Sequence, residues 1–213
     1  MTIEIIVIVF SSIVGYLLGS INTSIIIGKV FYKADIREYG SGNAGTTNVL
    51  RTFGKTAALA VLAGDFLKGV LACLIGRYVF GEINPGSGIF LGEYFAGLFA
   101  VIGHNWPVYF NFKGGKGVLT SFAVILMFAP EAALICLGAF IVIVAVTRYV
   151  SLGSMLSAIL YLILAFIFNE PLPMLLIGAV LVALIIIRHS SNIKRLLAGN
   201  EKKLTFKNTK ERF

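Results

Sequence analysis

Charged side chains are scarce in this sequence: Asp, Glu, Lys and Arg make up only 13% of its 213 residues, whereas hydrophobic residues make up 58%. Soluble domains contain roughly 45–50% apolar residues, and the mean hydropathy of this chain is +0.92. A soluble protein of this length would need more polar surface than the sequence has. The composition therefore excludes a soluble globular protein and predicts an all-α, polytopic membrane protein.

Cysteine and histidine are also rare, with two residues of each. Cys73 and Cys136 both fall inside apolar runs, so we expect small packing residues rather than a disulfide or a metal pair. Without a Cys/His cluster, a structural metal is not expected. The first hydrophobic run also lacks a basic start and an A-x-A cleavage site, which argues against a signal peptide.

Long hydrophobic runs, by contrast, dominate the chain. They cover residues 3–31, 54–80, 88–112, 117–130, 132–147, 152–168 and 171–187. Each predicts a helix, because a chain that crosses lipid must satisfy its backbone hydrogen bonds internally. The fourth and fifth are shorter than the ~20 residues that usually span a membrane, so we expect short core helices or a locally thinned bilayer there. The sequence predicts one integral-membrane domain, 1–213, with seven transmembrane helices. Gly15 and Gly19 predict close helix packing in the first of them.

The distribution of basic residues predicts the orientation. All but two of the 18 Lys and Arg residues lie in 29–55, 113–116, 148 or 188–212, which alternate with the other loops. Those other loops carry acidic residues, namely Glu82, Glu131 and Glu170. The positive-inside rule then puts the N-terminus outside and the C-terminus in the cytoplasm. The alternation supports seven spans independently of hydropathy.

Four polar stretches fall on the cytoplasmic side of this topology: 40–51 (GSGNAGTTNVLR), 103–117, 148–154 and 188–203. The outer loops are short and plain, so the unusual chemistry gathers at one end of the bundle and predicts a site there. The cations of these stretches outnumber the acids; they are Arg51, Lys113, Lys116, Arg148, Arg188 and Arg195. Glycine-rich segments can turn backbone N–H groups toward an anion, and Arg and Lys suit phosphate oxygens. We therefore predict a phosphate-bearing ligand.

Each of these features also has a purely structural interpretation. The lysines from Lys202 onward could be anchors beside anionic lipid, and SGNAG could be an ordinary turn. The segment 113–117 (KGGKG) is not a Walker A loop, because Gly rather than Ser or Thr follows its second lysine. Asp65 and Lys68 share a helix face and form either a structural ion pair or an extension of the polar site into the membrane.

Taken together and in order, the motifs resemble the bacterial acyl-phosphate:glycerol-3-phosphate acyltransferase family. The resemblance covers nearly the whole chain, and the ordered set is specific although no single motif decides it. The matching segments are 41–49 with Arg51, Asp65 with 68–69, 103–105 through 113–117, Arg148 with Ser151 and Ser154, and 188–189 with 192–193 and Arg195. The family pattern in the first motif is SGNPG; here Ala44 replaces the proline, which makes the loop less rigid but keeps its donors.

The resemblance implies a multi-pass enzyme of the bacterial cytoplasmic membrane whose active site faces the cytoplasm. It implies transfer of a fatty acyl group from acyl phosphate to the 1-hydroxyl of sn-glycerol 3-phosphate, giving lysophosphatidate and inorganic phosphate in phospholipid synthesis. It implies no metal, no coenzyme and no nucleic-acid partner, and it makes membrane lipid the surroundings of the site. The sequence leaves the oligomeric state open and is compatible with a monomer.

The residues agree with acyl transfer that needs no covalent nucleophile. No G-x-S-x-G elbow is present, and neither histidine starts an H-x4-D motif, since Tyr109 and Lys194 stand where the aspartate would be. An acyl phosphate is already activated, so positioning and charge stabilisation can lower much of the barrier.

We therefore predict direct attack of the glycerol hydroxyl on the acyl carbonyl, with the hydroxyl proton passing to the phosphate of glycerol 3-phosphate. His189 and Asn192, which share a face if the last helix continues, are predicted with Ser151 as the catalytic residues. The predicted substrate-binding residues are Ser41, Asn43, Asn48, Arg51, Lys68, His104, Asn105, Lys113, Lys116, Arg148, Ser154, Arg195 and Glu201.

Three other function classes fit the same ligand chemistry. A transporter of a phosphorylated solute would also need cationic rims, but it should show repeats and polar residues at both faces. A lipid-phosphate hydrolase would need a nucleophile or metal that the sequence does not offer. A non-catalytic lipid-binding scaffold predicts no turnover.

Overall fold

The structure, a computed structural model, describes residues 2–81 and 90–204. Glu82 and the basic tail beyond residue 204 lie outside the described residues. Within them the chain is all-helical, as predicted. The α-helices are α1 (Thr2–Gly19), α2 (Thr23–Phe31), α3 (Thr46–Thr52), α4 (Lys55–Phe80), α5 (Leu91–Asn105), α6 (Val118–Phe128), α7 (Pro130–Thr147), α8 (Val150–Ile167), α9 (Leu172–Arg188) and α10 (Ser190–Leu197). Two 3₁₀ turns are η1 (Ile36–Glu38) and η2 (Val108–Phe110).

Each of the seven predicted apolar segments contains a helix, but not all of these helices are long enough to span a membrane. Four stretches in the described part of the chain have the length and apolar character required, and α9 with α10 makes a fifth if that bent pair counts as one span. Helices α5 and α6 have only 15 and 11 residues. Helix α5 stops at Asn105 because Pro107 follows, and the residue before a proline disfavours helical geometry. The count of seven spans and the orientation of the termini stay predictions.

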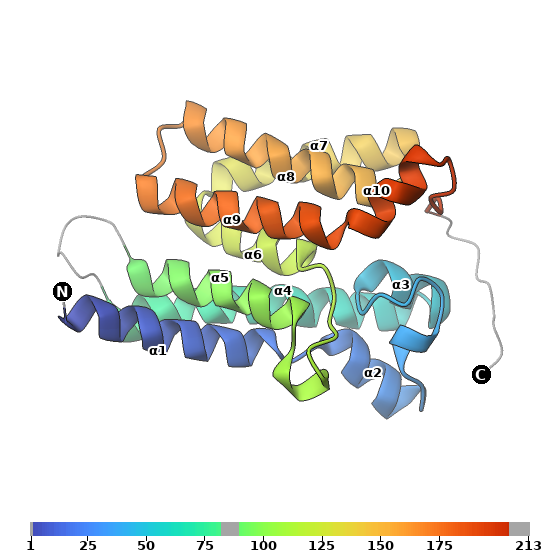
Figure 1. Cartoon of the computed structure of the whole chain (residues 1–213), viewed down its shortest axis with the longest axis horizontal. Helices are drawn as coiled ribbons and strands as arrows, with labels where there is room; N and C mark the ends of the chain where they lie inside the picture. The colour runs from blue at the N-terminus through green and yellow to red at the C-terminus, as the bar shows by residue number, and fades with distance from the viewer. Residues whose placement is uncertain (1, 82–89, 205–213) are drawn as a thin grey trace.

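The helices form two groups joined by α6. In Figure 1, α1, α4 and α5 lie in the lower half and pack against one another, while α7, α8 and α9 lie in the upper half. Helix α6 contacts members of both groups. The predicted close packing of the first helix is confirmed, because a Cβ on Gly15 or Gly19 would lie within about 2 Å of a carbonyl oxygen of α5.

Two helices are interrupted at the same end of the bundle. Helix α1 ends at Gly19, and α2 begins after Asn22, whose side chain caps it by accepting from the Ile25 backbone N–H (3.1 Å). Helix α9 ends at Arg188, and the chain bends by 56° at His189 before α10 continues. The predicted alignment of His189 and Asn192 assumed a continuous last helix, whereas the chain is bent at His189.

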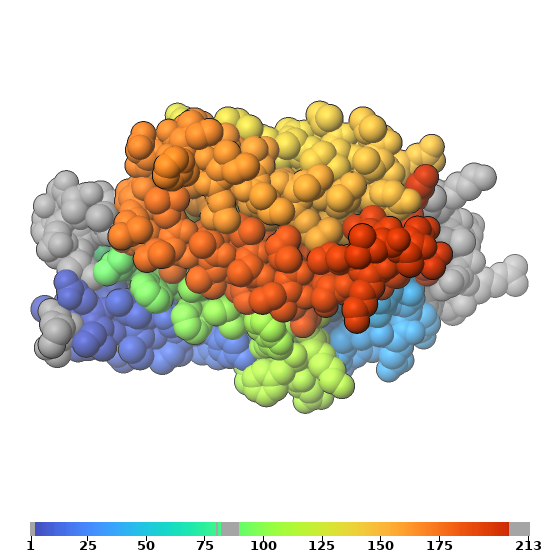
Figure 2. All heavy atoms as spheres, turned by 45° about the horizontal axis from the view of Figure 1, so that its top comes forward, coloured from blue at the N-terminus to red at the C-terminus, as the bar shows by residue number. Residues whose placement is uncertain are grey.

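The order of the helices brings four connecting segments together, in the lower middle and on the right in Figure 1. We call them the rim: residues 32–54, 106–117, 148–149 and 189–204. Hydrogen bonds join them, from Arg37 Nη1 to the Lys113 carbonyl (3.1 Å) and from the Leu204 N–H to the Arg148 carbonyl (2.7 Å). In the space-filling view of Figure 2, α10 and the first rim segment lie at the same end of the molecule.

Candidate functional site

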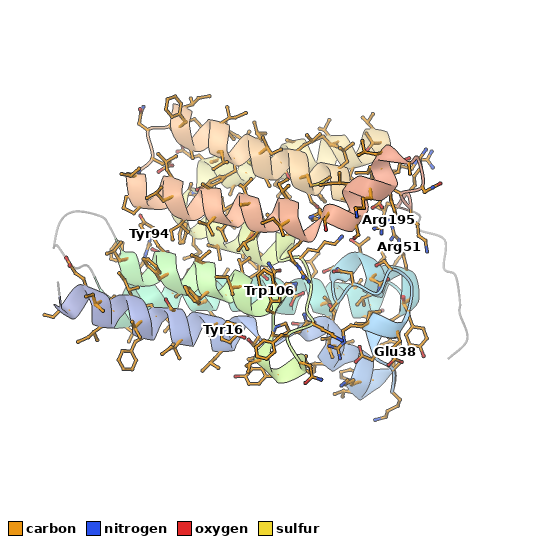
Figure 3. The ribbon with its side chains drawn as sticks, viewed as in Figure 1. Tyr16, Glu38, Arg51, Tyr94, Trp106 and Arg195 are labelled. Carbon is orange, nitrogen blue, oxygen red and sulfur yellow. The ribbon has the colours of Figure 1, made fainter. Side chains whose placement is uncertain are left out.

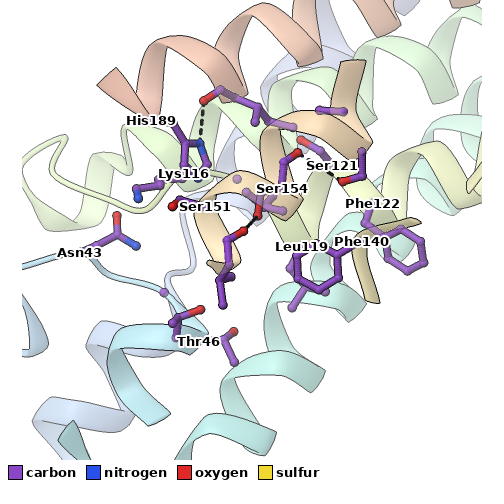
Figure 4. Close-up of a pocket in the computed structure, with 18 of the residues that line it drawn as sticks. Asn43, Thr46, Lys116, Leu119, Ser121, Phe122, Phe140, Ser151, Ser154 and His189 are labelled. Atoms are coloured by element: carbon purple, nitrogen blue, oxygen red, sulfur yellow. Dashed lines mark hydrogen bonds between the residues drawn. The ribbon is translucent and has the colours of Figure 1, made fainter. Parts of the chain in front are cut away.

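A cavity of about 790 Å³ opens among the rim segments and extends between the helices. Its lining changes character along its length. Polar groups from the rim line one part, including Asn43, Lys116, Ser151 and His189, and apolar side chains of α4, α6, α7 and α8 line the rest (Figure 4). The cavity can therefore hold a ligand with an anionic end and an apolar end.

Most of the predicted site residues meet in this cavity although they are far apart in the sequence. The predicted residues that line it are Ser41, Asn43, Asn48, Arg51, His104, Lys116, Ser151, Ser154, His189, Asn192, Arg195 and Glu201. Arg51 and Arg195 lie near one another at the rim end of the molecule, and Tyr94 marks the opposite end (Figure 3). Four predicted residues do not line it, namely Lys68, Asn105, Lys113 and Arg148.

These four residues contact the lining from behind or lie beside it. Lys68 is buried, and its ammonium bonds other protein groups. The Asn105 and Lys113 carbonyls accept from Gly114 N–H and Arg37. Arg148 adopts a left-handed conformation (φ 61°) at the turn between α7 and α8. Its carbonyl is held by the tail segment.

The first rim segment is organised by the side chain of Asn48. Its Oδ1 accepts from the Ser41 N–H (2.8 Å), and its Nδ2 donates to the carbonyls of Ile36 (3.1 Å) and Tyr39 (3.0 Å). Gly40 has a φ of +62°, and a Cβ there would lie 2.2 Å from that Oδ1. Asn48 thus uses its amide within the protein and sets the loop that presents Ser41 and Asn43 to the cavity.

Two glycines of the KGGKG segment do not turn their backbone N–H groups toward an anion, although glycine-rich segments were expected to do so. The Gly114 and Gly115 N–H groups donate to the carbonyls of Asn105 (3.2 Å) and His104 (3.0 Å), so they are not turned toward a ligand. A Cβ on Gly114 would lie 2.0 Å from the His104 carbonyl oxygen, and one on Gly115 would lie 2.6 Å from the Ala44 carbonyl oxygen. The expectation of a backbone anion cradle at these two residues was wrong; the glycines allow close packing.

Arg188, one of the cations of the polar stretches, is hydrogen-bonded to another segment of the protein. Its Nη2 and Nε donate to the Gly115 carbonyl at 2.8 and 3.0 Å, and its guanidinium lies 5.3 Å from the centre of the Trp106 ring. The bond joins α9 to a loop more than 70 residues earlier in the chain. The sequence shows a cation at 188 and a glycine-rich segment at 113–117, but nothing in it indicates that Arg188 bonds to Gly115.

Glu201 connects three of the predicted site residues. Its Oε1 accepts from Ser151 Oγ (2.7 Å) and Asn192 Nδ2 (2.6 Å), and its Oε2 accepts from Arg195 Nε (2.7 Å). Burial raises the pKa of Glu201, but the hydrogen bonds from Asn192 and Ser151 outweigh it, and the net pKa lies below the usual range. The carboxylate is therefore ionised at neutral pH and holds α8, α10 and the tail together.

Lys116 and His189 are two titratable groups of the cavity whose environments differ strongly from water. Burial, opposed by the charge of Glu201 and assisted by the nearby Arg195 and Arg188, lowers the pKa of Lys116 to about 8. Lys116 Nζ hydrogen-bonds to Asn192 Oδ1. Burial and the charge of Lys116 also lower the pKa of His189, which lies just beyond α9, to about 4. At neutral pH the cavity presents a neutral imidazole next to a cationic amine.

The predicted pair of Asp65 and Lys68 is confirmed, with Lys68 Nζ 2.8 Å from Asp65 Oδ1. Both side chains are almost completely buried in α4. The pair also reaches α5, since Lys68 Nζ lies 2.9 Å from His104 Nδ1. Asp65 and His104 line the cavity.

Sequence reasoning missed the apolar wall of the cavity. It comes mainly from α6, α7 and α8, and its members include Leu119, Phe122, Ile125, Ala133, Cys136, Phe140, Ala158 and Tyr161. Along α8 the lining runs from Ser151 to Tyr161, which is about 15 Å at the rise of an α-helix. The sequence does not distinguish these apolar residues from apolar residues that face lipid.

The chain is similar to known acyltransferases along most of its length. Residues 9–199 match the family model described as glycerol-3-phosphate acyltransferase. The glycerol-3-phosphate acyltransferase of Thermoanaerobacter pseudethanolicus is 46% identical over 196 residues, which cover 92% of this chain and 95% of that protein. The enzyme of the same name from Clostridioides difficile is 45% identical over 193 residues, 91% of this chain and 93% of that one.

Two solved structures have the same fold. A crystal structure of PlsY (YgiH), an integral membrane glycerol 3-phosphate acyltransferase, in its glycerol 3-phosphate form has a TM-score of 0.85 and 40% identity. It covers 93% of this chain and 96% of that one. The lysophosphatidic acid form of PlsY has a TM-score of 0.82 and 39% identity, with the same coverage.

Proposed function

The chain belongs to the glycerol-3-phosphate acyltransferase family, and we propose that it transfers a fatty acyl group from acyl phosphate to the 1-hydroxyl of sn-glycerol 3-phosphate in the rim cavity. The products are lysophosphatidate and inorganic phosphate. One observation carries the assignment: a single cavity joins a cationic rim to an apolar wall between helices. The acyl phosphate donor, which has a phosphate and a lipid tail, needs both the cationic rim and the apolar wall. Glycerol 3-phosphate needs only the cationic rim.

The cations of the rim bind the phosphates. Arg51, Lys116 and Arg195 line the same part of the cavity as Ser41 and Asn43, and guanidinium and ammonium groups form charge-assisted hydrogen bonds with phosphate oxygens. Arg51 at present donates to the Lys202 carbonyl (3.1 Å). It can exchange that neutral acceptor for a phosphate oxygen of glycerol 3-phosphate.

The acyl chain of the donor lies along the apolar wall. Each methylene buried there contributes about 0.8 kcal/mol, so the wall binds the tail of the donor and leaves its acyl phosphate group at the polar end. The reacting carbonyl then lies near Ser151 and Ser154, where the lining changes from apolar to polar (Figure 4).

The reaction is a direct displacement. The oxygen of the glycerol 1-hydroxyl attacks the acyl carbonyl carbon, the bond from that carbon to the phosphate oxygen breaks, and inorganic phosphate leaves. His189 Nδ1 donates to the Ile185 carbonyl (2.8 Å), so its Nε2 is left as an acceptor that orients the hydroxyl. Asn192 and Ser151, held by Glu201, support the developing oxyanion.

The hydroxyl proton ends on the phosphate of glycerol 3-phosphate. His189 has a pKa of about 4, which makes it a poor final proton acceptor, whereas the second pKa of a phosphate monoester is about 6. His189 therefore acts by orienting the hydroxyl. No protein carboxylate among the described lining residues is free for the task, because Glu201 and Asp65 are both paired.

A turnover assay tests the function and the donor together. The purified protein in detergent receives labelled glycerol 3-phosphate with acyl phosphate, acyl-CoA or acyl carrier protein in separate reactions, and lysophosphatidate and free phosphate are measured. We expect product from acyl phosphate alone, and a much lower turnover from the His189→Ala variant. Equal turnover with acyl-CoA would overturn the donor assignment, and no product from any donor would overturn the enzymatic one.

We also propose that the protein lies in the bacterial cytoplasmic membrane with the rim facing the cytoplasm. The basic residues of the rim and the acidic Glu131 and Glu170 at the other end support this orientation. Single cysteines at Asn111 and Glu170, in a background without Cys73 and Cys136, can be labelled with an impermeant maleimide in intact cells. We expect reaction at 170 and protection at 111; the reverse pattern would invert the topology.

A further inference from the structure

The chain has two histidines, and both line the cavity. His104 lies near the end of α5, and His189 lies between α9 and α10. Each side chain is almost fully buried, so the hydrogen bond at one ring nitrogen decides which role the other can take. The partners of the two Nδ1 atoms are of opposite kinds.

His189 must carry its proton on Nδ1. Among the described residues, that atom bonds to the Ile185 carbonyl oxygen at 2.8 Å, and a carbonyl oxygen can only accept. The neutral ring then has an unprotonated Nε2. This histidine presents an acceptor to the cavity.

His104 must carry its proton on Nε2. Its Nδ1 lies 2.9 Å from Lys68 Nζ, which also lies 3.0 Å from the Ile21 carbonyl oxygen and 2.8 Å from Asp65 Oδ1. An ammonium can only donate, and His104 Nδ1 lies 3.7 Å from Asp65 Oδ1, which is too far for Nδ1 to donate to that carboxylate. Nδ1 of His104 is therefore one of the acceptors, and its Nε2 becomes a donor.

The Nε2–H of His104 faces a space that Gly115 leaves open. A Cβ on Gly115 would lie 2.1 Å from that nitrogen and 2.6 Å from the Ala44 carbonyl oxygen. Among the described residues, Nε2 of His104 has no hydrogen-bond partner. It is a donor without a protein partner in the described part of the chain, at the wall of the cavity and next to the segment that carries Asn43.

We propose that Asp65 and Lys68 are positioning residues that fix His104 as an Nε2–H donor, so that the two histidines give the same cavity one donor and one acceptor. The ligand of the donor is a negatively charged oxygen of a phosphate-bearing substrate. That identity rests on the proposed function, whereas the two tautomers do not. The chemistry asks for both roles, because an attacking hydroxyl needs an acceptor while the phosphate and the carbonyl oxygen need donors.

Nitrogen-15 NMR of the histidine rings tests the tautomers without turnover. Protonated and unprotonated ring nitrogens have well-separated ¹⁵N shifts, and with two histidines in the chain, His104→Gln and His189→Gln assign every signal. We expect Nε2–H for His104 and Nδ1–H for His189 in the wild-type protein in detergent at neutral pH. The same tautomer at both residues, or an exchanging mixture at His104, would overturn the proposal.

A matched pair of double variants tests the role of the ion pair. Asp65→Asn/Lys68→Met removes both charges without leaving one unpaired, and Arg77→Met/Glu93→Gln does the same to a second pair between α4 and α5. We expect the first to give mixed tautomers at His104 and a roughly 10²-fold fall in kcat/KM, the usual effect of losing one oxyanion donor. The second should leave the His104 signal unchanged, and a loss of the single tautomer in both variants would contradict a specific role for Lys68.

Ligand titration identifies the oxygen that His104 contacts. A change of the Nε2–H signal on addition of glycerol 3-phosphate alone assigns the donor to that phosphate, and a change only with a non-hydrolysable acyl phosphonate assigns it to the acyl donor. No change with either ligand would overturn the donor role. If wild-type enzyme turns over while His104 is Nδ1–H, this inference fails and the function stands; if the tautomers are as proposed and turnover is absent, the reverse holds.

Discussion

Two ion pairs that involve α4 differ in what they contact. Near the rim, Asp65 and Lys68 bond to one another and to His104, and Asp65 and His104 line the cavity. Nine residues later on the same helix, ~14 Å away at the helical rise, Arg77 Nε bonds Glu93 Oε2 of α5 at 2.8 Å. The second pair is covered by the Phe90 ring, 4.8 Å from the guanidinium, and neither member lines the cavity.

The comparison shows that a buried charge in a membrane helix does not by itself mark a functional site. Burying either pair costs desolvation energy, and mutual attraction offsets that cost only with good geometry. The pair of Arg77 and Glu93, which we call the far pair, joins α4 to α5, and neither of its residues lines the cavity. The pair of Asp65 and Lys68 has a third partner, His104, which lines the cavity. We therefore expect changes at Asp65 and Lys68 to affect kinetics, and changes at Arg77 and Glu93 to affect stability.

The largest effect is expected from His189→Ala, which removes the acceptor that orients the hydroxyl. We expect kcat to fall by about 10²-fold, because the attacking hydroxyl is no longer held in position, with little change in KM. Steady-state kinetics in detergent measure both. Glu93→Gln at the far pair serves as the control, and a fall in kcat as large as that of His189→Ala would break the comparison.

The next effect is expected from Arg51→Ala, which removes a phosphate-binding guanidinium from the rim. We expect the KM for glycerol 3-phosphate to rise by about 10- to 100-fold, equivalent to the ~1.5–3 kcal/mol of a hydrogen bond to a charged group, while kcat changes less. Arg51→Lys keeps the charge but loses the planar fork, so it should lie between the two. An unchanged KM in Arg51→Ala would remove this residue from the site.

A smaller effect is expected from pH, through Lys116. Its pKa of about 8 in the free enzyme is below the ordinary 10.5, so the amine is charged below pH 8 and becomes neutral as the pH rises through that value. The phosphate of the substrate is already a dianion there, since its second pKa is about 6. We expect kcat/KM for glycerol 3-phosphate to fall above about pH 8, by up to about tenfold per pH unit. Lys116→Arg stays charged and should lack this decline; an identical decline in the variant would assign it to another group.

The smallest kinetic effect is expected at the far pair. Arg77→Met leaves the Glu93 carboxylate buried and unpaired, which costs about 3–5 kcal/mol of stability, yet the folded fraction should keep its kcat and KM. Arg77→Met/Glu93→Gln should recover most of that stability. Thermal unfolding in detergent, together with kinetics per folded enzyme, separates the two effects. A kinetic defect that persists in the double variant would show that this pair also reaches the site.

The sequence predicted which residues lie at the polar ends of the helices better than which helix faces pack against one another. The four polar stretches, the shared face of Asp65 and Lys68, and most lining residues of the rim could be predicted, because polar groups at the boundaries of apolar runs stand out. The pairing of Arg77 with Glu93 could not, since the two lie on different helices, and neither could the bonds of Arg188 to Gly115. Such long-range pairs depend on how the helices pack.

The apolar wall could not be predicted for a related reason. Cys136 lines the cavity and Ile135 is exposed on the surface of the bundle, yet both belong to one uninterrupted apolar run. In a soluble protein, the polar face of a helix would mark its outside, but lipid imposes no such pattern. The glycines at 114 and 115 were misread for the opposite reason. Their flexibility suggested an anion cradle, whereas lack of space for a Cβ explains them.

The central claim is that one cavity holds the phosphates at the rim and the acyl chain along α6, α7 and α8. A non-hydrolysable acyl phosphonate with a photoreactive diazirine at the far end of its chain tests this directly, with labelled residues mapped by mass spectrometry. We predict labelling at the deep lining, at Cys136 or Tyr161, and its loss in the presence of excess unlabelled phosphonate. Labelling that is confined to the exposed side chains Leu134 and Val142, and that competitor does not displace, would contradict the account.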